Sequence, residues 1–155
     1  MATTRVWRIS HMDFSKTAFS GEGAKLFGGR FNSPGVPAIY TSGALSLSLL
    51  ELLVQVEDRE YLNDCIQFYA DVPNDLIYKP KTEELPDDWN KIPYGKSSQK
   101  FGDEWIHESQ YAVLKIPSVV VPVENNYVIN PNHTAFDNIE LSGGSNVLFD
   151  PRLSK

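Results

Sequence analysis

Short hydrophobic runs alternate with polar, turn-forming segments along the whole chain. Apolar and polar positions alternate through 65–72, which predicts a β-strand with Ile66, Phe68 and Ala70 on one face. Asparagine and proline clusters predict turns at 73–75 and at Asn125–Asn126. Shorter apolar runs predict further strands at 6–9, 38–40, 76–78, 112–116, 118–121, 127–129 and 146–149.

Two longer segments predict helices. In the segment 44–56, leucines alternate with serines as in a strand, but four positions recur at the spacing of one helical face: Ala44, Ser48, Glu51 and Gln55. Because the segment is long for a strand, we expect a helix. A second helix is expected over 97–111, with Phe101, Trp105 and Ile106 turned inward. Many short strands with two helices favour an α+β fold over a doubly wound parallel sheet.

The remaining stretches are expected to be loops, chiefly 11–37 and the acidic, proline-rich 79–94. A loop as long as 11–37 inside a compact domain is often functional. The chain of 155 residues, 41% of them hydrophobic, is long enough for a core, and we expect one domain over 1–155.

Composition narrows the cellular setting. No apolar run approaches the roughly 20 residues of a membrane helix, and residues 1–10 lack the basic and apolar regions of a secretory signal. The single cysteine, Cys65, excludes an intramolecular disulfide and is expected to be a buried small hydrophobic residue. We therefore expect a cytoplasmic protein with no membrane segment.

The net charge of −6 is spread unevenly. Residues 1–50 carry five Lys/Arg and two Asp/Glu, for +3, whereas residues 51–90 carry three and eleven, for −8. Residues 91–155 carry six and seven, for −1. The overall charge disfavours nucleic-acid binding, while the N-terminal third can still attract a small anion. The acidic middle is either a solvated face or a surface for a basic partner.

The triplet Gly28-Gly29-Arg30 is the first candidate for a binding site. Exposed backbone N–H groups beside a guanidinium would suit a pyrophosphate, although the same triplet also fits a glycine turn with a surface arginine. It is neither a P-loop nor a dinucleotide fingerprint, because the required spacing and the Gly-Lys-Ser/Thr ending are absent.

Two further residues could complete such a site. Glu51 lies among leucines on the expected helix, so it is either an exposed acid or a carboxylate directed into a cleft, with Arg30 or Arg8 as a partner. Tyr40 ends a short strand and either packs in the sheet or stacks on a flat ring. Together these residues suit an anionic ligand that contains a ring.

Other chemistries find less support. The histidines are scattered at positions 11, 107 and 133 without metal-ligand spacing, so we expect no metal site. Ser118 follows a proline and lies outside any Gly-x-Ser-x-Gly setting, so it is not expected to be a hydrolase nucleophile.

In the order and spacing of several motifs, the chain resembles the RES-domain family, whose members are toxins of bacterial toxin–antitoxin modules. The family is named for an arginine, a glutamate and a serine, which match Arg30, Glu51 and Ser118 here. Phe31 and Thr134 depart from the usual tryptophan and proline. Further matches are Trp7-Arg8, Pro34-Gly35-Val36-Pro37, Tyr40-Thr41-Ser42, Glu124-Asn125-Asn126-Tyr127, Asn130-Pro131-Asn132-His133 and Phe149-Asp150-Pro151-Arg152-Leu153.

The resemblance implies an ADP-ribosyltransferase-like fold, in which short mixed and antiparallel strands form a cleft with flanking helices. It also implies NAD as the substrate, with no metal. Glu51 would support the oxocarbenium-like ribose, Arg30 and Arg8 would hold the pyrophosphate, and Tyr40 would pack on nicotinamide or ribose. Ser118 would hydrogen-bond the substrate or orient Glu51.

The resemblance further implies an Xre-type helix-turn-helix antitoxin that covers the cleft, and a toxin homodimer within a larger complex. The reaction would be NAD hydrolysis or phosphorolysis, which depletes cellular NAD and arrests growth. One alternative is transfer of ADP-ribose to a protein or metabolite. Another is a non-catalytic binding module that keeps the pocket as a scaffold.

Overall fold

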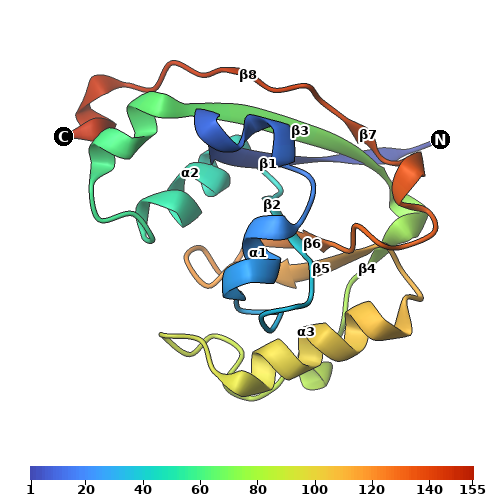
Figure 1. Ribbon diagram of the computed structural model, residues 1–155. Helices are drawn as coiled ribbons and strands as arrows, with labels where there is room; N and C mark the ends of the chain where they lie inside the picture. The colour runs from blue at the N-terminus through green and yellow to red at the C-terminus, as the bar shows by residue number, and fades with distance from the viewer.

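One curled β-sheet runs through the protein, whose computed structural model describes residues 1–155 (Figure 1). Its strands are β1 (Thr3–His11), β2 (Ile39–Ser42), β3 (Cys65–Pro73), β4 (Ile77–Tyr78), β5 (Val113–Pro117), β6 (Asn125–Ile129), β7 (Glu140–Leu141) and β8 (Ser145–Asn146). The order is β4-β5-β6-β2-β1-β3-β7, with β8 also paired to β3. All pairs are antiparallel except β4 with β5.

Three α-helices accompany the sheet: α1 (Glu22–Phe27), α2 (Leu45–Leu53) and α3 (Lys96–Glu108). In Figure 1, α3 lies below the part of the sheet that contains β4, β5 and β6, whereas α2 lies beside β1 and β2. None of the helices combines the length and apolarity needed to cross a membrane. Short 3-10 helices complete the chain at Met12–Thr17, Arg59–Asp64, Asn74–Leu76, Thr82–Glu84, Phe136–Asn138 and Pro151–Ser154.

Alternating side chains of β5 and β6 separate two hydrophobic clusters. Val113 and Ile129 belong to a cluster shared with β1 and β3, while Leu114 and Val128 point to the other face. There they pack with Trp105 and with other apolar residues of α3 and the loop before it. This period of two fixes the register of the central strands, because a shift by one residue would exchange the two faces.

The sheet opens between β1 and β2. β1 pairs with β3 along its whole length, but it pairs with β2 only at Trp7 and Ser42. β2 instead follows β6 from Ile39 to Ser42. The two halves of the sheet therefore diverge, and α2 begins directly after β2 at this point.

The expected α+β class is confirmed, and so are the two long helices, although both are shorter than expected. The helix expected over 44–56 is α2, and α3 ends at Glu108, where Ser109 adopts a left-handed conformation. Cys65 is buried, as expected, and its thiol donates to the Tyr61 carbonyl at 3.3 Å. Burial raises the pKa of the Cys65 thiol to about 11.

Residues 11–37, expected to be mostly loop, also contain α1. Three local expectations are wrong. Residues 119–121 form bends instead of the end of a strand over 118–121. Asn125 and Asn126 begin β6 instead of forming a turn, because Ser42 and Ile116 flank Asn126 in the neighbouring strands. The final expected strand, 146–149, is reduced to its first residue in β8.

Candidate functional site

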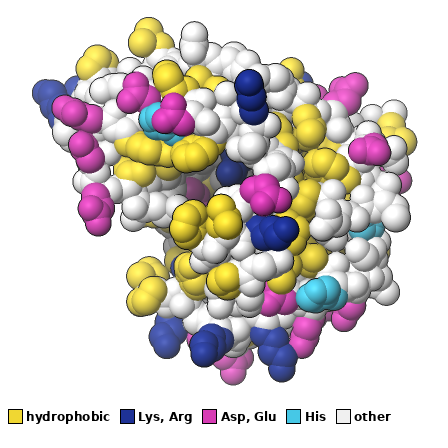
Figure 2. Space-filling view, in the orientation of Figure 1, with side chains coloured by type: hydrophobic (Ala, Val, Ile, Leu, Met, Phe, Trp, Pro, Cys, Tyr) yellow, Lys and Arg dark blue, Asp and Glu magenta, His cyan; other side chains and the backbone are white.

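A cleft of about 820 Å³ lies where the two halves of the sheet diverge. Its walls come from β1, β2, α1, α2, the turn at 27–31, residues 92–94, 116–117 and 119–120, and Asn126. Figure 2 shows the molecule hollowed between its upper and lower parts, with hydrophobic side chains around the opening. The volume falls within the range of small-molecule and cofactor sites.

Glu51 projects from α2 into this cleft and is half-buried. Its Oε2 accepts a hydrogen bond of 2.5 Å from the Asn126 side-chain amide, and Oε1 accepts none from the protein. Burial raises the pKa of the Glu51 carboxyl, while the Asn126 hydrogen bond and the charge of Arg30 act in the opposite direction. Glu51 makes no ion pair within 4 Å, so its charge is not neutralised by direct contact.

Arg30 lies in the wall opposite α2, on the turn that follows α1. Its Nη1 donates to the carbonyls of Trp89 and Lys91 at 2.9 and 2.8 Å, and the guanidinium faces the Tyr94 ring at 5.8 Å. Burial lowers the pKa of Arg30, and nearby Glu51 opposes that shift. Nε and Nη2 of Arg30 donate to no protein atom, so these groups are available to a ligand.

Arg8 supplies a second cation from β1. Its Nη1 donates to the Tyr40 carbonyl at 3.0 Å, but its Nε is buried and has no hydrogen-bond partner. No carboxylate lies within 4 Å of Arg8, and burial lowers the pKa of its guanidinium. A buried cation without a counter-charge is costly unless a ligand supplies one.

Tyr40 lines the cleft with its ring, but its hydroxyl is already engaged. The hydroxyl donates to Asn32 Oδ1 at 2.6 Å and accepts from the Phe31 N–H at 3.0 Å. It also approaches Gly29 so closely that a Cβ there would lie 2.7 Å from the hydroxyl oxygen. Tyr40 therefore holds the turn that carries Arg30, and burial raises the pKa of its hydroxyl.

Of the two alternatives for Gly28-Gly29, a backbone nest and a glycine turn, the structure shows the turn. The Gly28 N–H donates to the Ala24 carbonyl at 2.7 Å and ends α1, with a φ of +75° that favours glycine. The Gly29 N–H donates to the Asn32 carbonyl at 2.9 Å. Gly28 and Gly29 line the cleft, but because both N–H groups are used within the protein, neither is free to bind an anion there.

A model of the RES domain family matches residues 5–150. The chain belongs to the RES-domain family. It is 38% identical over 126 residues to "Toxin Res" of Photorhabdus laumondii, covering 81% of each protein. It is also 32% identical over 156 residues to the "Prs ADP-ribosylating toxin" of Sphingobium sp., covering 97% of each.

A solved structure shares the fold of this RES domain. The crystal structure of the M. tuberculosis MbcT-MbcA toxin–antitoxin complex superposes with a TM-score of 0.76 at 19% identity. The match covers 94% of this chain and 85% of that one. The expected α+β architecture is thereby confirmed, and the chain shares its fold with a protein of this complex.

Ser118 does not line the cleft of this RES domain. It is fully buried, and its hydroxyl accepts hydrogen bonds from the N–H groups of Val120 and Val121, both at 3.0 Å. The serine therefore fixes the loop whose residues Val119 and Val120 form part of the wall. The side chain that contacts Glu51 is that of Asn126, so Ser118 does not orient Glu51 by direct contact.

Sequence reasoning missed two parts of the site. The local pattern at Asn126 indicates a turn, and only the family motif that contains this residue pointed to a further role. The segment Ile92-Pro93-Tyr94 belongs to the acidic, proline-rich stretch and gives no signal except its proline content, yet it lines the cleft. Arg30 anchors this segment through the carbonyls of Trp89 and Lys91.

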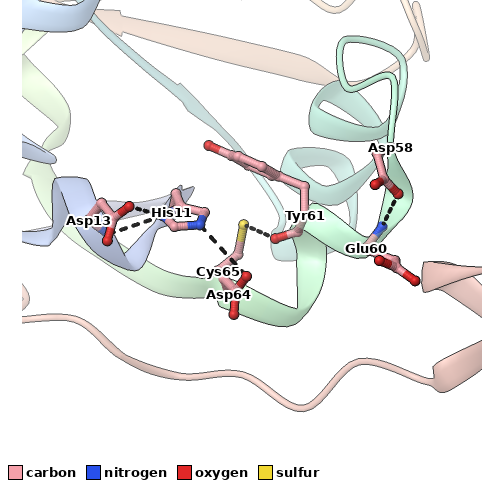
Figure 3. Close-up of polar contacts among 7 residues, drawn as sticks. All are labelled: His11, Asp13, Asp58, Glu60, Tyr61, Asp64 and Cys65. Carbon is pink, nitrogen blue, oxygen red and sulfur yellow. Dashed lines mark hydrogen bonds and ion pairs between the residues drawn. The ribbon is translucent and has the colours of Figure 1, made fainter.

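A second hollow, of about 500 Å³, lies beside the 3-10 helix Arg59–Asp64. Figure 3 shows four of its lining residues, Asp58, Glu60, Tyr61 and Asp64. His11, which does not line the hollow, lies 3.4 Å from Asp13 and 3.9 Å from Asp64. Four carboxylates line this hollow and no cation does, so it would repel an anionic ligand: Glu57, Asp58, Glu60 and Asp64. The cleft that contains Arg8, Arg30 and Glu51 is the candidate active site of the RES domain.

Proposed function

We propose that this protein is a toxin that cleaves the nicotinamide–ribose bond of NAD in the cleft between α2 and the Arg30 turn. The observation that carries the proposal is the charge arrangement. One half-buried carboxylate and two guanidinium groups share a cleft of dinucleotide-binding size without forming an ion pair. The name of the Sphingobium relative, an ADP-ribosylating toxin, supports NAD as the substrate.

Arg8 and Arg30 would bind the pyrophosphate of NAD. The Arg8 Nε lacks a partner, and two of the three nitrogens of the Arg30 guanidinium make no protein hydrogen bond. Guanidinium groups bind phosphate oxygens through charge-assisted, frequently bidentate hydrogen bonds. The pyrophosphate would supply the counter-charge that the protein itself does not place beside these groups.

Glu51 would stabilise the transition state. Nicotinamide is cationic in NAD and leaves as a neutral molecule, so breaking its bond to C1′ needs no general acid. The bonding electron pair leaves with nicotinamide, and positive charge develops on the ribose. A carboxylate beside the ribose stabilises this charge and can accept a hydrogen bond from a ribose hydroxyl, as in glycoside cleavage. Water or phosphate then adds at C1′ and releases its proton.

Transfer of ADP-ribose to a macromolecule is the second candidate. The first step is the same, and only the nucleophile that attacks C1′ differs. The relative named for ADP-ribosylation matches the chain over 97% of its length, which favours this candidate specifically. Apolar side chains at the cleft are also exposed to an approaching macromolecule, because Phe27 and Ile92 line the cleft and are 81% and 80% exposed.

The apolar mouth also supports an antitoxin partner. Val54, 66% exposed, joins Phe27 and Ile92 around the cleft, and exposed apolar groups of this kind mark interaction sites. We propose that an antitoxin, of the Xre type that the family resemblance implies, covers this mouth. The toxin homodimer remains a prediction from the same resemblance.

One experiment separates these reactions. Purified protein is incubated with NAD labelled on nicotinamide and, separately, on adenine, in buffer, with phosphate, and with cell lysate. Release of nicotinamide together with free ADP-ribose indicates hydrolysis. Release together with ADP-ribose phosphate indicates phosphorolysis, and release together with labelled macromolecules indicates transfer. No release of nicotinamide under any condition, together with normal cellular NAD after induction without antitoxin, would favour a non-catalytic binding module.

A further inference from the structure

The side chain of Asn126 is placed to control the Glu51 carboxylate. Asn126 lies on β6, between Ser42 of β2 and Ile116 of β5, so its backbone is fixed on both sides. Its side-chain Nδ2 lies 2.5 Å from Glu51 Oε2, while its Oδ1 lies 2.7 Å from the Ser42 hydroxyl oxygen. One amide thus joins the glutamate of α2 to the serine that ends β2.

The chemistry of the three side chains sets which group donates and which accepts in each of these hydrogen bonds. An ionised carboxylate only accepts hydrogen bonds, so the amide must present its N–H to Glu51. Its carbonyl oxygen then faces Ser42, whose hydroxyl donates to it. The Ser42 hydroxyl therefore fixes the amide in the orientation that favours a charged Glu51. The helix is fixed as well, because the Ser48 hydroxyl donates to the Trp7 carbonyl at 2.9 Å.

Glu51 accepts this hydrogen bond but forms no ion pair. Arg30 is close enough to influence the charge of Glu51, yet no nitrogen of Arg30 or Arg8 lies within 4 Å of its carboxylate. Without Asn126, the half-buried carboxylate would lose its only protein hydrogen bond. Burial would then favour the protonated form of Glu51, which carries no charge to stabilise the ribose.

We propose that Asn126 is a positioning residue that keeps Glu51 ionised, and that Ser42 fixes the orientation of the Asn126 amide. This inference rests on the proposed function, because it assigns Glu51 to the reacting ribose. It predicts that loss of Asn126 lowers the rate of nicotinamide release, without direct contact between Asn126 and the reacting atoms.

The test compares Asn126→Asp with Asn125→Asp. The first places a second carboxylate beside Glu51, so that the two carboxylates share one proton. The acid limb of the pH profile of kcat/KM should therefore move upward by about one pH unit or more. Asn125 is the neighbouring residue, and its side chain makes no hydrogen bond in the structure, so the control adds the same charge without this contact. An acid limb that moves equally in both variants would overturn the proposal.

Two further variants address folding and orientation. Asn126→Ala should move the acid limb of the pH profile of kcat/KM upward, and Ser42→Ala should lower kcat about three- to tenfold with a smaller shift in the same direction. If Asn126→Asp does not fold, these two variants decide the outcome. Wild-type pH profiles in both would overturn the proposal.

A titration without substrate separates this inference from the proposed function. The Glu51 side-chain carboxyl carbon is followed by NMR in the wild type, Asn126→Ala and Asn125→Asp. A Glu51 titration that moves upward in Asn126→Ala but not in the control supports the positioning role, even in a protein that releases no nicotinamide. An unmoved titration overturns that role, even in a protein that cleaves NAD.

Discussion

Replacing Glu51 with glutamine would test both the proposed chemistry and the cost of holding a carboxylate in the cleft. The change removes one negative charge but preserves the length of the side chain. The glutamine amide can still accept the Asn126 hydrogen bond through its own carbonyl oxygen. The substitution therefore isolates the charge from the shape and packing of α2.

The expected loss of rate follows from the position of the charge. A carboxylate about 4 Å from a developing positive charge contributes about 4 kcal/mol at an effective dielectric constant of about 20. Loss of one preorganised electrostatic group typically costs about 100- to 1,000-fold in kcat. We expect Glu51→Gln to reduce nicotinamide release by at least about 100-fold, and Glu51→Ala to do the same.

Stability should change in the opposite direction. Burial raises the folded-state pKa of Glu51 above its unfolded value, so the folded protein holds this proton more tightly. Stability therefore falls as pH rises from the ordinary glutamate pKa through the folded-state pKa. The glutamine variant avoids this loss. Its Tm should equal or exceed that of the wild type at neutral pH, and any advantage should disappear in acid.

The assays are nicotinamide release with excess NAD and thermal unfolding at neutral and acidic pH. Glu104→Gln is a suitable control, because Glu104 is 61% exposed on α3 and does not line the cleft. The control should match the wild type in both assays. Turnover of Glu51→Gln within a fewfold of the wild type would refute the role of Glu51, and a large fall in its Tm would refute the stability argument.

Three further substitutions test the rest of the site. Arg8→Met removes a buried, uncompensated cation and should not lower Tm. It should weaken NAD binding, measured by calorimetry, about 10- to 100-fold, which is the scale of one charged hydrogen bond; unchanged affinity would exclude a pyrophosphate contact. Tyr40→Phe removes two hydrogen bonds and should lower Tm by several degrees, whereas a Tm equal to that of the wild type would show that the turn needs no such anchor. Ser118→Ala leaves two N–H groups without their acceptor and should also lower Tm; a stable variant with lost turnover would instead place the hydroxyl in the reaction.

Local pattern was sufficient where one element buries one regular face. The strand at 65–72 and the helix over 97–111 follow from the sequence because alternation or helical spacing already separates their buried from their exposed residues. Trp105 and Ile106 are buried as the spacing requires. The stripe through Ser48 and Glu51 likewise faces β1 and the cleft. In these elements, tertiary packing agrees with the local preference.

Short elements did not follow from local pattern. The helix α1 has six residues and a glycine within it, so it is too short to be stable alone and depends on its surroundings. Asparagine favours turns, yet Asn125 and Asn126 are strand residues because β2 and β5 pair with this part of β6 on both sides. Ser118 shows the same limit, since its burial was not visible in the residues around it.

Sequence alone determined the α+β class, the long elements and the family, because hydrophobic period and motif order are properties of the chain itself. It also placed Arg30, Tyr40 and Glu51 among the candidate residues. Only the tertiary structure decided that two cations and one acid share a cleft, that Tyr40 and Ser118 use their hydroxyls within the protein, and that Asn126 holds Glu51. These relations join residues far apart in the chain, and they exist only where strands and helices meet in space.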